Sequence, residues 1–145
     1  MSMRDVLIRE ALRGEPVTRL MNRHPISVDP SMTLETLVEE VFFFHKHKLY
    51  PVLEDDRVKG YVSLENVRDV PREKRREMSV REIMKPLDEQ TTLPESADAL
   101  EAFLRISKSS TGRLIISDHE HLIGIVSRTD VWDFVSLKLD LDKAA

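Results

Sequence analysis

Hydrophobic and polar positions follow the same order twice along the chain. Between Leu34 and Phe42, apolar residues recur every three or four positions, which predicts one buried face of a helix. Two runs rich in Val, Leu and Tyr follow at 49–53 and 58–62 with a polar segment between them, and this pattern predicts a β-hairpin. The same order returns from residue 96 onward. The chain is therefore predicted to contain two copies of one unit.

Two short strings of sequence relate the copies. Segment 60–67, GYVSLENV, reappears as GIVSRTDV at 124–131, and segment 17–21, VTRLM, reappears as VREIM at 80–84. Matches in the same order along the chain indicate an internal duplication.

The spacing between the copies changes once along the chain. Asp55 and its match Asp118 are one residue closer together than Gly60 and Gly124. We expect this slip in the hairpin turn, where an insertion costs little.

Each copy is expected to fold as β-α-β-β-α. Thr33 and Ser63 in the first copy, and Ser96 and Ser127 in the second, are the expected helix N-caps, because their hydroxyls can accept a hydrogen bond from a free backbone N–H. Neither small sheet can bury both of its faces alone. The predicted fold is therefore α/β (α+β), with tandem β-α-β-β-α repeats related by a pseudo-twofold axis.

Four segments follow from this layout. Residues 1–16 form a helical lead-in, 17–70 the first repeat and 80–140 the second repeat. The linker 71–79 mixes Arg, Lys and Glu, which is typical of a solvated helical turn.

Composition excludes several classes of protein. Among 145 residues, 41% are hydrophobic and 33% charged, which is typical of a globular protein rather than a disordered chain. The net charge of −4 gives no basic excess for nucleic acid, and the absence of cysteine excludes disulfides. No apolar run approaches the roughly 20 residues of a membrane span. A soluble module on the cytoplasmic side is expected.

The duplicated unit, closed each time by Gly-hydrophobic-Val-Ser-x-x-Asn/Asp, resembles the CBS domain pair. The resemblance extends from about Val17 to Leu137 and is most specific in the closing motif and in the opening Val-x-x-Leu/Ile-Met. It implies a regulatory module and not an enzyme. Such modules often bind AMP, ADP, ATP or S-adenosylmethionine between the repeats, and often dimerise into a flat disc. The implied partners are an adenosine-type small molecule and a second copy of the chain.

A narrower resemblance concerns three other segments. Residues 7–17, then 62–67 followed by 70–73, and finally 84–89 look like the CBS pair at the C-terminus of some site-2 protease homologues, which are intramembrane zinc metalloproteases. This resemblance implies a soluble regulatory tail whose catalytic membrane domain lies outside the chain.

The closing motif of the second copy has the chemistry of a nucleotide site. Ser127 stands where a strand is expected to end and a helix to begin, so its hydroxyl and the first helical N–H groups can meet phosphate oxygens. Asp130 lies on the same side of the helix and can accept hydrogen bonds from ribose hydroxyls, and Arg128 adds a positive charge. The same Ser-x-x-Asp spacing also describes a helix start that caps itself without a ligand. The repeat and the resemblance favour binding.

Three further residues are assigned to this second-copy site. Thr91 and Thr92 are expected as polar wall residues on the strand before the helix. Arg113 either lines the cleft or is exposed. Leu114 stands in the place of Pro51, which marks the edge of the pocket in the family.

The first copy departs from the nucleotide pattern. Asn66 replaces the acid, Leu64 replaces the cation, and Glu65 adds a negative charge. These changes predict a weaker site, or one for an uncharged nucleoside. Its candidate residues are Ser27, Tyr50, Pro51, Ser63 and Asn66.

Other chemistry is not supported by the sequence. His45 and His47 are two apart on a predicted helix and should diverge, so no metal site is expected there. No nucleophile has an evident base, and no glycine-rich phosphate loop occurs. Turnover of nucleotides is the weaker alternative to sensing, and a ligand-free dimerisation scaffold is the stronger one.

Consecutive aromatic residues raise the question of an interface. Phe42, Phe43 and Phe44 cannot all face one core, because neighbours on a helix are about 100° apart. At least one is expected to point toward the other repeat or a second subunit, with Trp132 and Phe134 as matching candidates.

Overall fold

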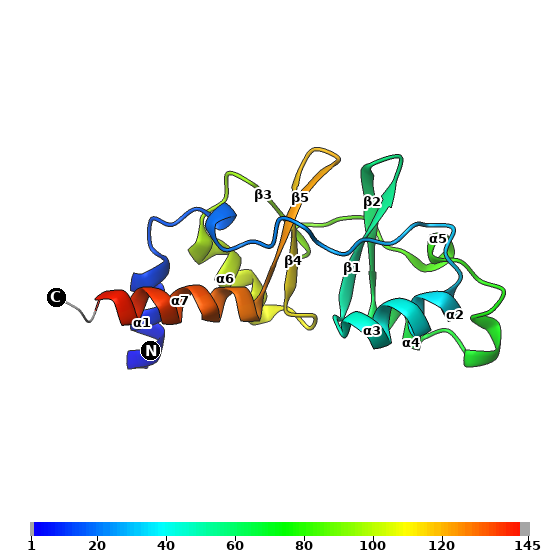
Figure 1. Ribbon diagram of the computed structural model, residues 1–145, viewed down its shortest axis with the longest axis horizontal. Helices are drawn as coiled ribbons and strands as arrows, with labels where there is room; N and C mark the ends of the chain where they lie inside the picture. Colours follow the sequence, from blue (N-terminus) through cyan, green and yellow to red (C-terminus); the bar gives the residue numbers. More distant parts are fainter. Residues whose placement is uncertain (1, 143–145) are drawn as a thin grey trace.

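Two hairpins lie side by side at the centre of the molecule (Figure 1). The computed structural model describes residues 2–142. The first hairpin pairs β1 (Leu49–Glu54) with β2 (Arg57–Ser63). The second sheet has the order β3-β4-β5, with β3 (Thr92–Pro94) parallel to β4 (Arg113–Asp118), and β5 (His121–Ser127) antiparallel to β4.

Helices lie mainly toward the two ends of the molecule (Figure 1). One end holds the N-terminal and C-terminal helices together with the long helix of the second repeat: α1 (Met3–Leu12), α6 (Ala99–Lys108) and α7 (Arg128–Asp142). The other end holds the shorter helices α2 (Leu34–Thr36), α3 (Phe43–His45), α4 (Leu64–Arg68) and α5 (Val80–Ile83). Two 3-10 turns, at Val17–Arg19 and Arg72–Lys74, and a π-helical segment, Leu37–Phe42, complete the chain. The predicted fold class, tandem α/β units, is confirmed.

Most of the predicted helix caps are present. Thr33 accepts a hydrogen bond from the Thr36 N–H at 3.2 Å, and Ser63 and Ser127 cap their helices in the same way. The prediction for Ser96 is wrong. Asp98 caps α6 instead, accepting from the Glu101 N–H at 2.9 Å. The chain is still in a turn at Ser96, because the next N–H bonds back to the carbonyl of residue 94.

The hairpins correspond residue for residue, so the expected slip in the turn is wrong. Leu49 pairs with Ser63 and Arg113 pairs with Ser127, and each hairpin closes with two turn residues. Arg113 is therefore the counterpart of Leu49. By the same register, the counterpart of Pro51 is Ile115 and not Leu114.

The additional residue of the first copy lies in its helix. Leu49 follows the cap Thr33 by sixteen residues, whereas Arg113 follows the cap Asp98 by fifteen. The first-copy helix contains the π-helical segment Leu37–Phe42, and α6 does not. A π segment accommodates one extra residue while the helix on either side keeps its buried face.

The opening segment of each repeat packs on the other repeat. Val17, Leu20 and Met21 belong to a core cluster with residues of β4, β5, α6 and α7, and α1 contributes Ile8 and Leu12 to it. Conversely, the cluster around β1 and β2 includes Val80, Ile83 and Met84. Each half of the core thus contains the opening motif of the opposite half.

Gly60 and Gly124 make this exchange possible. A Cβ atom at Gly60 would lie 2.2 Å from the carbonyl oxygen of Lys85, and one at Gly124 would lie 2.6 Å from that of Asn22. These carbonyls accept hydrogen bonds from the residues that follow each glycine, at 2.9 and 3.0 Å. The glycine of each closing motif is needed for this close backbone approach.

The two sheets are joined directly. Leu49, Ile115 and Ile125 are fully buried in a cluster between the hairpins. Near the hairpin tips, the Val58 N–H donates to the carbonyl of Glu120 at 2.8 Å, and Glu120 also pairs with the Arg57 guanidinium at 2.8 Å. Within residues 2–142, no helix is long and apolar enough to cross a membrane.

Candidate functional site

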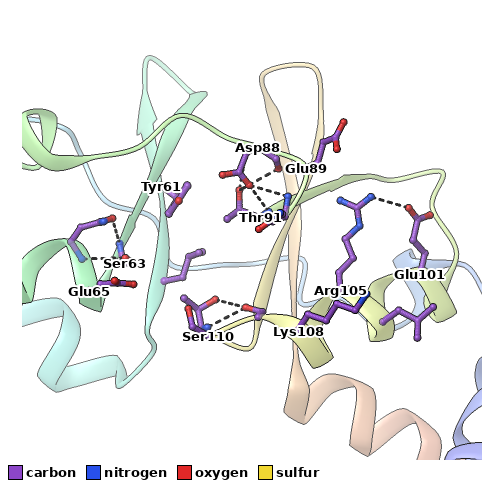
Figure 2. A pocket seen from close by; sticks show the side chains of 16 residues that line it. Tyr61, Ser63, Glu65, Asp88, Glu89, Thr91, Glu101, Arg105, Lys108 and Ser110 are labelled. Carbon is purple, nitrogen blue, oxygen red and sulfur yellow. Dashed lines mark hydrogen bonds and ion pairs between the residues drawn. The ribbon is translucent and has the colours of Figure 1, made fainter.

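A cavity of about 640 Å³ lies between the two repeats (Figure 2). Its walls come from both copies: the end of β2 and the start of α4, the segment before β3, the outer face of α6, and the loop between α6 and β4. The lining residues are Leu49, Tyr61, Ser63, Glu65, Asn66, Asp88, Glu89, Gln90, Thr91, Glu101, Leu104, Arg105, Lys108, Ser109, Ser110 and Thr111.

The closing motif of the first repeat forms one wall. The Ser63 hydroxyl accepts from the Asn66 N–H at 3.3 Å, and the Asn66 side-chain oxygen accepts from the Ser63 N–H at 3.1 Å. This capping box fixes both side chains at the cavity. In the described part of the chain, the Asn66 side-chain NH₂ group has no hydrogen-bond partner, so it can donate to a ligand.

An acidic wall adjoins this motif. The Asp88 carboxylate accepts from the backbone N–H and the hydroxyl of Thr91, at 2.9 and 3.0 Å, which orders the segment before β3. Burial raises the pKa of the Tyr61 hydroxyl, and the nearby carboxylates of Asp88 and Glu65 raise it further. The potential at this wall is therefore negative.

The opposite wall, on α6, carries the basic groups. Arg105 pairs with Glu101 at 3.2 Å, one helical turn away. Lys108 has no ion-pair partner within residues 2–142. Lys108 is thus the basic group of the cavity that is available to an anion.

The residues predicted for the second-copy site do not all line this cavity. Thr91 lines the cavity, beside the closing motif of the first copy. Thr92 does not line it. Its hydroxyl donates to the carbonyl of Ile115 at 2.9 Å and lies 3.1 Å from the hydroxyl of Ser117.

Ser127 and Asp130 lie outside the lining of this cavity and bond to each other. The Asp130 carboxylate accepts from the Ser127 N–H at 2.8 Å and from its hydroxyl at 3.0 Å. The Ser127 hydroxyl accepts in turn from the Asp130 N–H at 3.2 Å. The structure therefore contains the self-capping helix start that the sequence allowed as an alternative. A ligand that bonds to Asp130 would share this carboxylate with the cap.

Arg128 is directed toward α6. Its guanidinium donates to the carbonyls of Ile106, at 3.3 Å, and Ser109, at 2.8 Å. A Cβ atom at Gly112 would lie 2.4 Å from this guanidinium. Arg128 therefore supports the loop that forms one wall of the cavity, from behind.

Arg113 is neither exposed nor in the lining of this cavity. It is 7% exposed and donates to the Leu49 carbonyl at 2.7 Å, with its guanidinium 5.9 Å from the centre of the Tyr50 ring. Burial lowers the pKa of Arg113, while Tyr50 and Asp130 act in the opposite direction. This buried cation connects β4 to the first repeat.

The remaining first-copy candidates do not gather at one place. Tyr50 is fully buried, and its hydroxyl donates to the Val41 carbonyl at 3.3 Å. Pro51 is buried within β1, where its carbonyl accepts from the N–H of Val28. Ser27 lines a smaller cavity of about 340 Å³ beside the turn between β1 and β2. Only Ser63 and Asn66 of this predicted set line the larger cavity.

The expected divergence of His45 and His47 is wrong. Lys46 adopts a left-handed conformation that ends the helix, with φ of 62°. The two rings consequently stack, with centroids 6.5 Å apart. Burial lowers the pKa of His47, as does the nearby Arg113. In the described part of the chain, no group of three or more His, Asp or Glu residues is arranged to hold a metal ion.

Sequence reasoning missed the wall formed by α6 and its following loop. Arg105, Lys108 and the segment 109–111 occupy the polar face of a strongly amphipathic helix and the loop after it. The sequence feature that could have indicated this wall is a basic last helical turn followed by a Ser-Ser-Thr-Gly segment directly before a strand.

Comparison with solved structures shows the same fold at low sequence identity. The CBS domain of a bacterial CNNM/CorC family Mg²⁺ transporter in complex with ATP has a TM-score of 0.71 and 20% identity, over 92% of this chain and 97% of that one. A CBS domain-containing protein from Bacillus anthracis has a TM-score of 0.73 and 18% identity, over 90% and 99%.

A third structure of the same fold belongs to a larger protein. It comes from Methanocaldococcus jannaschii and is described as a proposed archaeal homolog of γ-AMPK. Its TM-score is 0.73 and its identity 17%, over 90% of this chain and 51% of that one. A search of curated proteins finds no match.

The family model named CBS domain matches the chain twice, at residues 17–73 and 80–131. These two matches coincide with the two structural repeats and cover most of the chain. The chain belongs to the CBS domain family, as a tandem pair.

Proposed function

We propose that the chain is a regulatory module that binds an adenosine-type nucleotide, AMP, ADP or ATP, or S-adenosylmethionine, between its repeats. The module would control an attached or partner protein. The segments that resemble site-2 protease homologues suggest an intramembrane zinc metalloprotease as that protein. This chain would then be its cytoplasmic part.

The observation that carries this proposal is the cavity between the repeats. Its volume of about 640 Å³ falls within the range of small-molecule sites. Ser63 and Asn66 offer a hydroxyl and an amide to ribose, and Lys108 offers a cation to an acidic group. Because both repeats form the walls, a ligand that binds one relative tilt of the repeats more tightly than another would shift the pair toward that tilt. The ATP complex of the transporter CBS domain supports a nucleotide as the ligand class.

Thermal unfolding tests the proposal. The purified chain is heated alone and with each of the four ligands at about 1 mM. A ligand at roughly 100 times its dissociation constant stabilises the folded state by about 2.7 kcal/mol, which raises Tm by several degrees. The absence of any shift with all four ligands would contradict the proposal.

Two matched variants locate the ligand. Asn66→Ala and Asp130→Ala each remove one side chain of a closing motif and its cap, so each is compared by its ligand-induced shift rather than by its Tm. Loss of the shift only in Asn66→Ala places the ligand in the described cavity. Loss only in Asp130→Ala places it at the second-copy motif, where Ser127, Arg128 and Arg113 were predicted to act.

A ligand-free dimerisation scaffold is the second candidate function. Phe43 and Phe44 in α3 are 64% and 73% exposed, Leu64 at the start of α4 is 41% exposed, and Trp132 on α7 is 37% exposed. Contiguous exposed apolar side chains are typical of surfaces that bind another protein, and the adjacent Phe43 and Phe44 are the most exposed of this set. A homodimer would cover them.

Light scattering distinguishes the oligomeric state. The chain is expected to elute as a dimer, and Phe44→Asp as a monomer with an unchanged circular dichroism spectrum. Phe42→Asp is not a suitable control, because Phe42 is 8% exposed and belongs to the core. A monomeric wild-type chain would remove support from the scaffold function.

A further inference from the structure

We infer, on the basis of the proposed function, that the cavity between the repeats selects an adenosine-type ligand with a zwitterionic or cationic tail over a nucleoside polyphosphate. The tail best matched is that of S-adenosylmethionine, which carries a sulfonium, an ammonium and a carboxylate. The argument rests on how the charges of the lining are arranged.

The charge of the lining is the first step. Four carboxylates and two basic side chains line the cavity. One carboxylate and one base, Glu101 and Arg105, neutralise each other through their ion pair at 3.2 Å. The groups left to act on a ligand are Glu65, Asp88 and Glu89 against Lys108. A triphosphate would bring several negative charges beside three carboxylates and one ammonium.

The acidic groups are also placed to receive a cation. Tyr61 lines the cavity with its ring half-buried, and both Glu65 and Asp88 lie close enough to act on its hydroxyl. Figure 2 shows these three side chains on the side of the cavity away from Lys108. An aromatic ring with carboxylates beside it is an arrangement that attracts ammonium and sulfonium groups.

The basic wall completes the match. Lys108 lies on α6, across the cavity from the closing motif of the first repeat (Figure 2). Lys108 thus offers an ammonium to a carboxylate on the tail of a ligand, and the acidic wall at Tyr61 offers carboxylates to its cationic centre. Asn66 in place of an acid leaves the ribose contact neutral, so no further negative charge faces the ligand.

Calorimetric titration of the intact chain tests this selectivity with two probes that differ in one charge. S-adenosylhomocysteine lacks the methyl group and the sulfonium charge of S-adenosylmethionine and is otherwise the same molecule. The sulfonium form is expected to bind roughly two- to five-fold more tightly, as expected for a cation near an aromatic ring at a partly exposed site. ATP is expected to bind more weakly than either.

Matched variants show whether the cavity is responsible. Glu65→Gln removes one carboxylate of the acidic wall and is expected to reduce the preference for the sulfonium form, while Tyr61, Asp88 and Glu89 remain. Glu95→Gln makes the same change at an exposed residue outside the lining and should leave the preference intact.

The outcomes separate this inference from the proposed function. Equal affinity for the two probes, or tighter binding of ATP, would overturn the charge selectivity while leaving a nucleotide-binding module. A preference that is undiminished in Glu65→Gln would overturn the assignment to this cavity. No binding of any adenosine compound would overturn the proposed function, and the selectivity with it.

Discussion

At the scale of single residues, Arg128 supports the cavity wall rather than a phosphate. Its guanidinium bonds the carbonyls of Ile106 and Ser109 and lies against Gly112, whose φ of 69° only glycine adopts easily. Arg128→Ala is expected to lower the free energy of unfolding by about 1 kcal/mol, because its hydrogen bonds to two backbone carbonyls, one part-buried and one exposed, are lost. Urea unfolding measures this loss.

Hydrogen exchange provides a local measure of the same effect. In Arg128→Ala, the amide of Gly112, which donates to the Ser109 hydroxyl, is expected to exchange faster than in the wild type. Thr129→Ala, at the next and exposed position, is the control. Unchanged protection of this loop in Arg128→Ala would show that the loop does not depend on the guanidinium.

Also at the residue scale, His47 makes stability depend on pH. Burial and the charge of Arg113 lower its pKa in the folded state below the ordinary value of 6.5, while Asp130 opposes the shift and His45 adds to it. The unfolded chain therefore binds more protons as the pH falls below 6.5, and stability is lost in that range. In His47→Gln, chemical unfolding between pH 7 and 5 should depend less on pH. The exposed His24→Gln should retain the wild-type dependence, and equal profiles for the two variants would contradict this role.

At the scale of elements, the π-helical segment accounts for the one-residue difference between the repeats. Deleting Glu40, an exposed residue of this segment, should convert it to a regular α-helix of the length found in the second repeat. The deletion is expected to cost about 1–3 kcal/mol, within the usual range of single changes. Deleting the exposed Glu101 from the regular α6 should cost more, because the buried Ala102 and Ile106 that follow it rotate by about 100° relative to the buried Ala99 that precedes it. Circular dichroism and thermal unfolding of both variants measure the difference.

The same elements show how far the sequence predicts the site. Ser63, Asn66 and Thr91 could be placed at a cleft, because strand ends and helix starts can be read from local patterns. Arg105 and Lys108 could not, because the polar face of an amphipathic helix normally faces water. Only the neighbouring repeat turns that face into a wall. Arg113 is the converse case, a charged residue that the structure buries. A charged residue at the start of a strand gives no local sign of such burial.

At the scale of the whole molecule, the two repeats depend on each other to fold. Val17, Leu20 and Met21 complete the core of the second repeat, and Val80, Ile83 and Met84 complete that of the first. A cut between Met78 and Ser79 gives two fragments. In each fragment, the opening segment is separated from the core cluster in which it packs.

We therefore expect fragments 1–78 and 79–145 to be largely unfolded when expressed separately, because each exposes the apolar surface that the other covers. Mixing them in equal amounts should restore the folded state, since the exchanged segments then meet their own cores. Amide NMR spectra of each fragment and of the mixture provide the measurement. If either fragment alone gave the dispersed spectrum of a folded domain, the exchange of opening segments would not be what holds the pair together. The cavity between the repeats depends on the same exchange, so the mixture, and not either fragment, is expected to bind the adenosine-type ligand.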